Sequence, residues 1–346
     1  KTLNMKYVLS FALIVFFSPM VAEAQPFNSA VEYLDFLSDN SKVVSKDMWD
    51  YTRSIAKSKS ARKVEKKRQD LLQSIREAKR MIKAKKPFDD QRFIQQAYLQ
   101  YLELNYTILM DDYEKIIDLE AIAEESYDEM EAYIRLQDEI DEKMKASSDS
   151  LNVQVDRFAE VNNINLQTEQ SKTGAKLERA GMAFDYYNTF YLIFFKAFLE
   201  ENHFFASLES NDMAAAEQSR MALLAAAEEG MEKLRTEEAY SGDASLKQVC
   251  TRMMKHFQRE AKLQMPKVIS FYEKQEEFNR LDEAMKSKRK RDITQEDVDA
   301  FNKAVEAYNS AVKTINKDLE VLNEKQEDAL KDWNDTVEDF LKEHAA

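Results

Sequence analysis

The chain has 346 residues, 44% of them hydrophobic, which is enough to fill a folded core and excludes an intrinsically disordered protein. Only four glycines and four prolines occur, and this scarcity predicts an all-α protein built from long helices. The formal net charge of −14 argues against nucleic acid as a partner, and the single cysteine, Cys250, excludes an internal disulfide.

The N-terminal segment has the composition of a secretory signal peptide. Lys6 precedes an apolar run at 8–17, and the small-residue pattern Ala22-Glu23-Ala24 follows. This run is too short to span a bilayer, which takes about 20 helical residues, so a membrane anchor is the weaker interpretation. Residues 1–24, which include a short overhang ahead of Met5, are therefore expected to be removed by cleavage near Ala24. The chain is then exported to the periplasm or cell surface without a transmembrane anchor.

Two helical halves are expected after the signal peptide, residues 25–161 and residues 176–346. The segment between them, 162–175, contains Asn, Ser, Thr and Gly without helical periodicity and is interpreted as a linker. Pro87 marks a turn within the first half. The periodicity of apolar residues predicts helical segments near 29–84, 89–160, 176–208, 212–236, 244–287 and 295–343, some of which we expect to be interrupted.

Charged blocks of opposite sign lie in the first half. Residues 53–86 are rich in Lys and Arg, and residues 111–142 are rich in Asp and Glu. If the chain folds back at Pro87, the blocks can pair with each other, which is the favoured interpretation. The alternative is a free basic face that docks an anionic polymer. The candidate docking residues are Arg62, Lys63, Lys66 and Lys67.

The two halves resemble each other when they are offset by about 152 residues. Arg68 then matches Arg220, and Phe88 matches Tyr240. A second echo, with another offset, is the Val-Asp-x-Phe pattern at 155–158 and 298–301. These matches predict two related helical repeats, while coincidence between charged, leucine-containing helices is the alternative.

The segment 184–205 concentrates aromatic side chains at helical spacing, and such a stripe predicts a helix buried in the core. Two alternatives stay open. The segment could insert into a membrane, which the charges of Asp185 and Lys196 disfavour, or its rings could enclose an apolar ligand. The stripe consists of Phe184, Tyr187, Tyr191, Phe194 and Phe198.

The last predicted helix carries apolar residues at alternating spacings of four and three, as in a coiled coil, and so predicts an elongated bundle. One extra four-residue step interrupts this seam. Five asparagines directly follow apolar residues and are interpreted as a polar flank or as groups that bond to a neighbouring helix. The seam positions are Phe301, Val305, Tyr308, Val312, Ile315, Leu319, Leu322, Gln326, Leu330, Trp333, Val337 and Phe340, and the asparagines are at 302, 309, 316, 323 and 334.

Few side chains suit catalysis. Glu200 and His203 have the Glu-x-x-His spacing of helix-borne metal ligands, but a di-iron bundle needs this motif twice, and neither His256 nor His344 has an acidic residue three positions before it. Phosphate-binding loops, dinucleotide glycine turns and nucleophile elbows are absent from the sequence. We therefore expect no catalytic residue, no metal ligand and no cofactor. Cys250 lies at helical spacing with apolar residues and is expected to be a buried thiol.

Several stretches are similar to a little-characterised family of exported bacterial surface proteins of the leptospiral type, also met in Bacteroidetes-like bacteria. They are the KKPFDD turn, the segment IDLEAIAEESYDEMEAY at 117–133, DYYNTFYLIFFK at 185–196, and the closing run from FNKAVEAYNSAVKTIN to WNDTVEDFLKEH. The resemblance covers most of the chain after the signal peptide. It implies a location in the cell envelope and brings no known activity, substrate or functional residue.

Together these observations predict a non-enzymatic, exported helical-bundle protein that acts through interactions. The expected partner is an envelope protein or a surface polymer, and no nucleic acid is expected. The alternatives are a membrane-active protein that deploys the segment 184–205 and a carrier of an apolar ligand.

Overall fold

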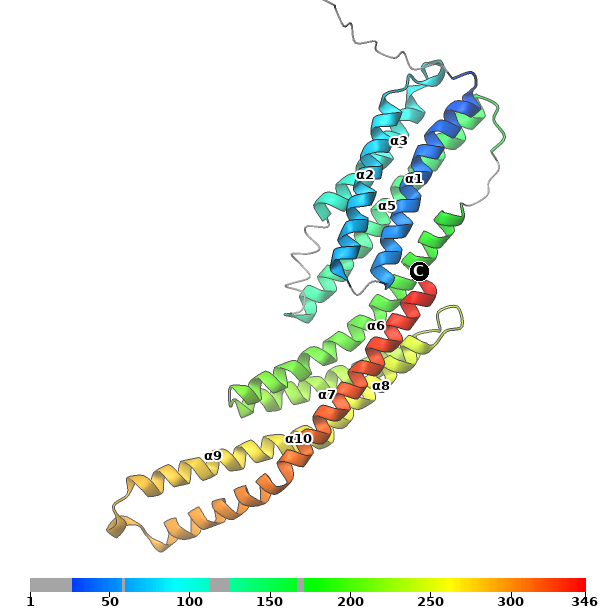
Figure 1. Ribbon diagram of the computed structural model, residues 1–346. Helices are drawn as coiled ribbons and strands as arrows, with labels where there is room; N and C mark the ends of the chain where they lie inside the picture. The colour runs from blue at the N-terminus through cyan, green and yellow to red at the C-terminus, as the bar shows by residue number, and fades with distance from the viewer. Residues whose placement is uncertain (1–26, 58–59, 113–124, 167–170) are drawn as a thin grey trace, which may run out of the picture.

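The computed structural model describes residues 27–57, 60–112, 125–166 and 171–346, and helices account for nearly all of them (Figure 1). Within these ranges no β-strand occurs, apart from an isolated bridge between Tyr240 and Asp243. The prediction of an all-α helical bundle is therefore confirmed. The expected signal peptide lies outside the described residues.

Four helices form what we call the N-terminal bundle. They are α1 (Ala30–Lys57), α2 (Ala61–Lys83), α3 (Arg92–Thr107) and α5 (Tyr127–Val161). A 3-10 turn at Phe88–Asp90 leads into α3, and a π-helical turn at Ile108–Asp112 extends it. Apolar residues three or four positions apart on each helix face one core. Its fully buried side chains include Tyr33, Leu37, Leu71, Ile75, Ile94, Leu102 and Phe158.

The C-terminal bundle has a similar arrangement. Its helices are α6 (Lys172–Glu209), α7 (Met213–Thr236), α8 (Ser245–Arg259) and the second half of α10 (Gln295–His344). A π-helical turn at Glu260–Gln264 leads from α8 into α9 (Met265–Ser287). The core of this bundle buries Phe190, Phe194, Phe204, Leu223, Cys250, Met254, Phe257, Trp333 and Phe340.

A two-helix arm projects from the C-terminal bundle (Figure 1). It consists of residues 271–309, in which α9 and the first half of α10 run side by side and are joined through a turn at Lys290–Asp292. Thr294 starts α10 with a capping box, since its side chain accepts a hydrogen bond from the Asp297 N–H while the Asp297 carboxylate accepts one from the Thr294 N–H. Ala304 is the one buried residue of the arm.

The two bundles pack against each other to give an elongated molecule (Figure 1). Ala56 of α1, and Met130 and Ile134 of α5, belong to the core of the C-terminal bundle. Helix α6 contacts both α1 and α5. The bundles therefore share apolar contacts in addition to the chain that connects them.

Two of the predicted helical segments are interrupted, as expected for some of them. The helix predicted at 29–84 divides, because α1 ends at Lys57 and α2 begins after the cap position Ser60. The chain between them alternates Lys and Ser and has no apolar side chain to hold a helix against the core. The helix predicted at 89–160 also divides, and Ser126 caps α5 by accepting a hydrogen bond from the Glu129 N–H.

Other predicted boundaries need smaller corrections. The helix predicted at 244–287 is divided by the π-helical turn between α8 and α9. The predicted linker, 162–175, is too long, because α6 begins at Lys172. Ser171 accepts a hydrogen bond from the Gly174 N–H, which places this glycine in the first helical turn. The five asparagines that follow seam residues of α10 are all exposed, in agreement with the polar-flank interpretation.

Matching contacts occur in the two bundles. Arg68 of α2 donates a 2.8 Å hydrogen bond to the carbonyl of Leu109, and Arg220 of α7 donates one of 2.8 Å to the carbonyl of Ala261. Each acceptor lies 41 residues after its arginine, in a π-helical turn. A set of aromatic contacts also matches: Tyr33 with Phe88 and Phe158, and Tyr186 with Tyr240 and Phe340.

The second sequence echo has no such spatial match. Residues 155–158 lie near the end of α5, whereas residues 298–301 lie near the start of α10. The Val-Asp-x-Phe pattern therefore lies near the C-terminal end of α5 but near the N-terminal end of α10.

Candidate functional site

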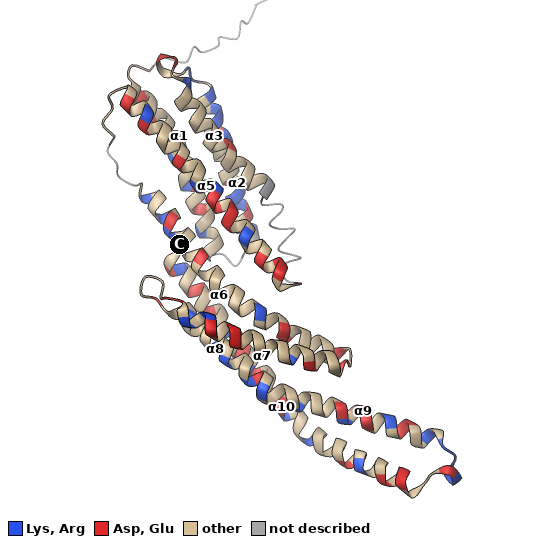
Figure 2. Ribbon diagram, turned by 180° about the vertical axis from the view of Figure 1, so that it is seen from behind, with Lys and Arg blue, Asp and Glu red and all other residues tan. Residues whose placement is uncertain are grey.

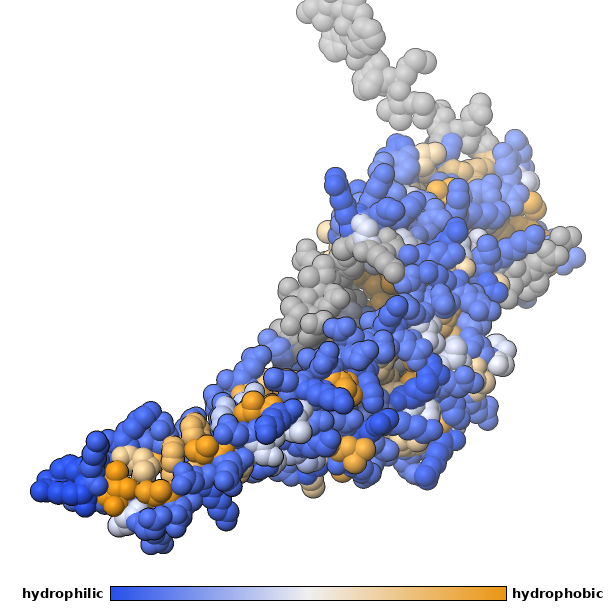
Figure 3. Space-filling model, turned by 60° about the horizontal axis from the view of Figure 1, so that its bottom comes forward, coloured by the Kyte–Doolittle hydropathy of each residue, from blue (hydrophilic) through white to orange (hydrophobic). Residues whose placement is uncertain are grey.

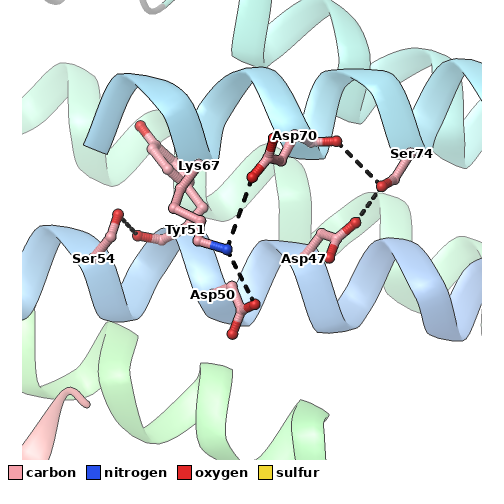
Figure 4. A network of polar contacts seen from close by, with 7 residues as sticks. All are labelled: Asp47, Asp50, Tyr51, Ser54, Lys67, Asp70 and Ser74. Carbon is pink, nitrogen blue, oxygen red and sulfur yellow. Dashed lines mark hydrogen bonds and ion pairs between the residues drawn. The ribbon is translucent and has the colours of Figure 1, made fainter. Parts of the chain in front are cut away.

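The four candidate anion-docking residues lie in the first two turns of α2. Arg62, Lys63 and Lys66 are exposed. Lys67 differs, because its Nζ lies 3.4 Å from Asp50 Oδ2 of α1 and 3.8 Å from Asp70 Oδ2 (Figure 4). The structure therefore brings the four cations together on one helix but uses Lys67 to hold α2 against α1.

A polar network continues along the contact between α1 and α2 (Figure 4). Ser74 donates a hydrogen bond to the Asp47 carboxylate. Farther along the basic block, Lys79 forms an ion pair with Glu103 of α3. Cations of the block thus find partners within the N-terminal bundle. Residues 113–124 of the acidic block lie outside the described residues, so the predicted pairing of the two blocks stays a prediction.

The aromatic stripe of α6 faces the interior of the C-terminal bundle. Phe194 is 5% exposed, and its ring stacks on that of Trp333 with a centroid distance of 4.4 Å and an interplanar angle of 15°. The ring of Phe198 also stacks with that of Phe194, with a centroid distance of 5.3 Å. The remaining members of the stripe, Phe184, Tyr187 and Tyr191, are partly buried against the same core.

The arm carries an aromatic row of its own. The rings of Phe278 and Tyr308 are nearly parallel, with centroids 5.1 Å apart, and Phe301 and Phe271 extend the row at 6.0 and 5.9 Å. All four side chains are half-buried. The space-filling view shows apolar surface on this projecting end of the molecule (Figure 3).

The tip of the arm is basic, although the chain as a whole is acidic (Figure 2). Acidic residues of the arm neutralise much of this charge. Arg289 and Arg291 form ion pairs with Asp292 at 2.7 and 3.7 Å, Lys288 pairs with Asp297 at 2.6 Å, and Lys286 pairs with Asp282 at 2.5 Å. The cations of the tip, all exposed, are Lys286, Lys288, Arg289, Lys290 and Arg291.

A buried polar cluster lies between α6, α8 and the π-helical turn. Glu201 is fully buried, Glu260 is 1% exposed, and the His256 side chain is 13% exposed. One nitrogen or oxygen atom from each of the three lies within 4.8 Å of the others. His256 Nε2 is 3.0 Å from Glu260 Oε1. Gln326 of α10 donates a 2.8 Å hydrogen bond to Glu201 Oε2.

Burial disfavours the charged forms in this cluster. It raises the pKa of Glu201 to about 9, with Glu260 adding to the rise, and the pKa of Glu260 to about 7. Burial also lowers the pKa of His256, against the opposing effect of Glu201.

Reasoning from the sequence missed this cluster, although a signal was present. Glu201 follows Phe194 and Ala197 at the helical spacing of the buried stripe of α6, and Gln326 occupies a position of the α10 seam. The Glu-x-x-His pattern places an acidic residue three positions before the histidine, whereas the acidic neighbour of His256 is Glu260, four positions after it. The signal in the sequence is an ionisable residue at a position of an apolar stripe, which indicates a buried polar site.

The singled-out Glu200 and His203 lie at the surface. His203 Nδ1 is 3.5 Å from Glu200 Oε2, and both side chains line a shallow groove between α6 and α7. Cys250 is fully buried and its thiol contacts the carbonyl of Phe190 at 3.8 Å.

Among the described helices, none has an apolar stretch long enough to cross a membrane. The chain matches no protein-family model, no curated protein and no solved structure.

Proposed function

We propose that this protein is a non-enzymatic, exported helical-bundle protein of the bacterial envelope that acts by binding another protein through its arm. The single observation that carries the proposal is the half-buried aromatic row of Phe271, Phe278, Phe301 and Tyr308. In both bundles four helices enclose such rings, whereas two described helices face each other in the arm (Figure 1).

The geometry of the arm suits a helical partner. Two helices cannot enclose a row of large rings, so one side of each ring stays in contact with water, and burial of apolar surface contributes about 25 cal/mol per Å². A helix laid along the row would complete the packing that the bundles achieve within the chain. Exposed aromatic residues on a projecting element are typical of protein interaction sites.

The charge of the tip defines the partner further. The five exposed cations at 286–291, four of which are paired with acidic residues of the arm, would favour an acidic surface over a basic one. We therefore propose that the partner is a protein whose apolar helical face is bordered by Asp or Glu side chains. Ion pairs at the rim contribute mainly to orientation and to the rate of association.

A cross-linking experiment identifies the partner and tests the arm at once. A photo-reactive residue in place of Val305, which lies between Phe301 and Tyr308, would capture the bound protein in envelope extract. The captured protein is then purified and titrated against the wild type and against the double variant Phe278→Glu with Tyr308→Glu. The matched control places glutamates at Met221 and Leu263, exposed apolar residues outside the arm.

We expect the arm variant to bind the purified partner at least about tenfold more weakly, since charges would replace buried rings, and the control to bind like the wild type. Equal binding by the arm variant would refute the role of the arm. A dimer in light scattering that the arm variant abolishes would instead mean that the row is covered by a second copy of the chain. Flotation of the wild type with liposomes would favour the membrane-active alternative.

The two alternative functions have weaker support. A membrane-active role would require α6 to leave the core, where Phe190, Phe194 and Phe204 are packed. A carrier role would require a cavity beside the aromatic stripe, and the two surface grooves that the structure describes are lined by other side chains.

We also propose that the two bundles arose by duplication of one helical unit. The matching Arg68 and Arg220 contacts support this, because both arginines reach a carbonyl in a π-helical turn at the same distance along the chain. The signal peptide at 1–24, export to the periplasm or cell surface, coiled-coil packing of the arm and the resemblance to the exported surface-protein family stand as further parts of this proposal.

A further inference from the structure

The C-terminal bundle contains a site with the chemistry of a metal centre. Three potential ligand atoms, two carboxylate oxygens and one imidazole nitrogen, converge within 4.8 Å from Glu201, His256 and Glu260. They come from α6, α8 and the π-helical turn, a type of helix irregularity that often occurs at functional sites. We propose that these three side chains bind one divalent transition-metal ion.

The hydrogen bonding of the cluster is incomplete. Glu201 Oε1, His256 Nε2 and both carboxylate oxygens of Glu260 are buried and have no hydrogen-bond partner among the described residues. The short distance between His256 and Glu260 does not have the geometry of a hydrogen bond. Buried polar atoms without partners are costly, and a cation placed between them would satisfy all of these atoms at once.

Charge leads to the same conclusion. Both carboxyl groups would bind the ion in their deprotonated forms, and two carboxylates buried side by side repel each other unless a cation lies between them. A divalent ion would balance the two negative charges. Gln326 would then act on the ligand Glu201 from outside, because its amide already orients the carboxylate.

The N-terminal bundle shows that the fold does not need these polar groups. The matching Arg68 and Arg220 contacts, and the matching rings around Tyr33 and Tyr186, relate positions in one bundle to positions in the other. The four polar residues then correspond to apolar ones: Met48 for Glu201, Leu104 for His256, Ile108 for Glu260 and Met144 for Gln326. Polar residues confined to one bundle indicate a ligand specific to that bundle.

The donor set selects the class of metal. One imidazole nitrogen and two carboxylate oxygens suit Zn²⁺ and its first-row neighbours, whereas Ca²⁺ takes six to eight oxygen ligands. His256 also lines a groove of about 430 Å³ between α8 and α10, from which an ion would have to reach the cluster. Water would occupy the coordination positions that the protein leaves open.

The test is a titration of the metal-stripped full chain with Zn²⁺ by calorimetry, repeated with Co²⁺, whose absorption spectrum reports nitrogen and oxygen ligands. Two variants remove ligands. Glu260→Gln keeps the shape of the side chain, and the triple variant E201M/H256L/E260I copies the apolar residues of the N-terminal bundle. The control variant, Glu200→Gln with His203→Ala, removes the surface pair of the same residue types.

We expect one ion per chain in the wild type and the control, binding at least about tenfold weaker in Glu260→Gln, and loss of binding in the triple variant. Zn²⁺ should raise the melting temperature of the wild type and leave that of the folded triple variant unchanged. A wild type that binds neither ion, or a triple variant that binds both, overturns the proposal. Binding lost only in the control would place the ion at the surface pair and also overturn it.

Discussion

At the scale of single residues, Phe194 is the clearest test of the aromatic helix. Its ring is buried and stacks with those of Trp333 and Phe198, so Phe194→Ala would leave a cavity and should destabilise the protein by about 3–5 kcal/mol. Chemical denaturation measures this change. Met182→Ala is the matched control, because Met182 lies on the same helix and is 56% exposed, and it should change stability little. A loss below about 1 kcal/mol for Phe194→Ala would mean that the stripe is not part of the core.

The same residue scale shows what the sequence could and could not reveal about the buried cluster. The periodicity of α6 predicts that Glu201 shares a face with Phe194, and the seam of α10 predicts an inward position for Gln326. That Glu201 meets His256 and Glu260 depends on how α6 packs on α8, and no local pattern carries this information. The convergence of the three side chains is therefore a property of tertiary packing, whereas the inward position of each one could be predicted.

At the scale of helices, the paired arginines give a prediction that covers both bundles. Arg220 is 14% exposed and bonds a carbonyl that the π-helical turn leaves without a normal helical partner. Arg220→Ala should therefore cost about 1.5–3 kcal/mol, and Arg68→Ala a similar amount. The control is Arg80→Ala, since Arg80 pairs with Glu77 in the same way but is 68% exposed, and it should have little effect. Equal effects of all three variants in denaturation experiments would contradict this role.

Helix propensity alone does not predict where each helix begins and ends. The break between α1 and α2 falls in a stretch of lysines and serines that are individually compatible with a helix. Helix α2 packs on α1, and local helix propensity does not encode this tertiary contact. The end of the long helix α10 was predictable within one residue, because its seam, with one extra four-residue step, runs from the arm through the bundle.

At the scale of the whole molecule, the sequence predicts an elongated shape from the length of α10 alone. Fifty residues of helix span about 75 Å, whereas a compact chain of this length would have a radius of gyration of about 20 Å. We expect X-ray scattering to give a radius of gyration well above that value. A value near about 20 Å would mean that the arm folds back on the bundles.

A shortened chain makes this prediction specific to the arm. Replacing residues 271–309 by a short Gly-Ser loop removes α9 from Phe271 to Ser287 and should reduce the maximum dimension by about 25 Å. The bundles should stay folded, because Ala304 is the one buried residue that is lost. A small loss of stability is expected, since Phe271 and Tyr272, which pack partly against the core of the C-terminal bundle, are also removed. Circular dichroism checks that the helices persist, and scattering measures the length. An unchanged maximum dimension would show that the arm does not project, and it would remove the geometric basis for binding a partner along its aromatic row.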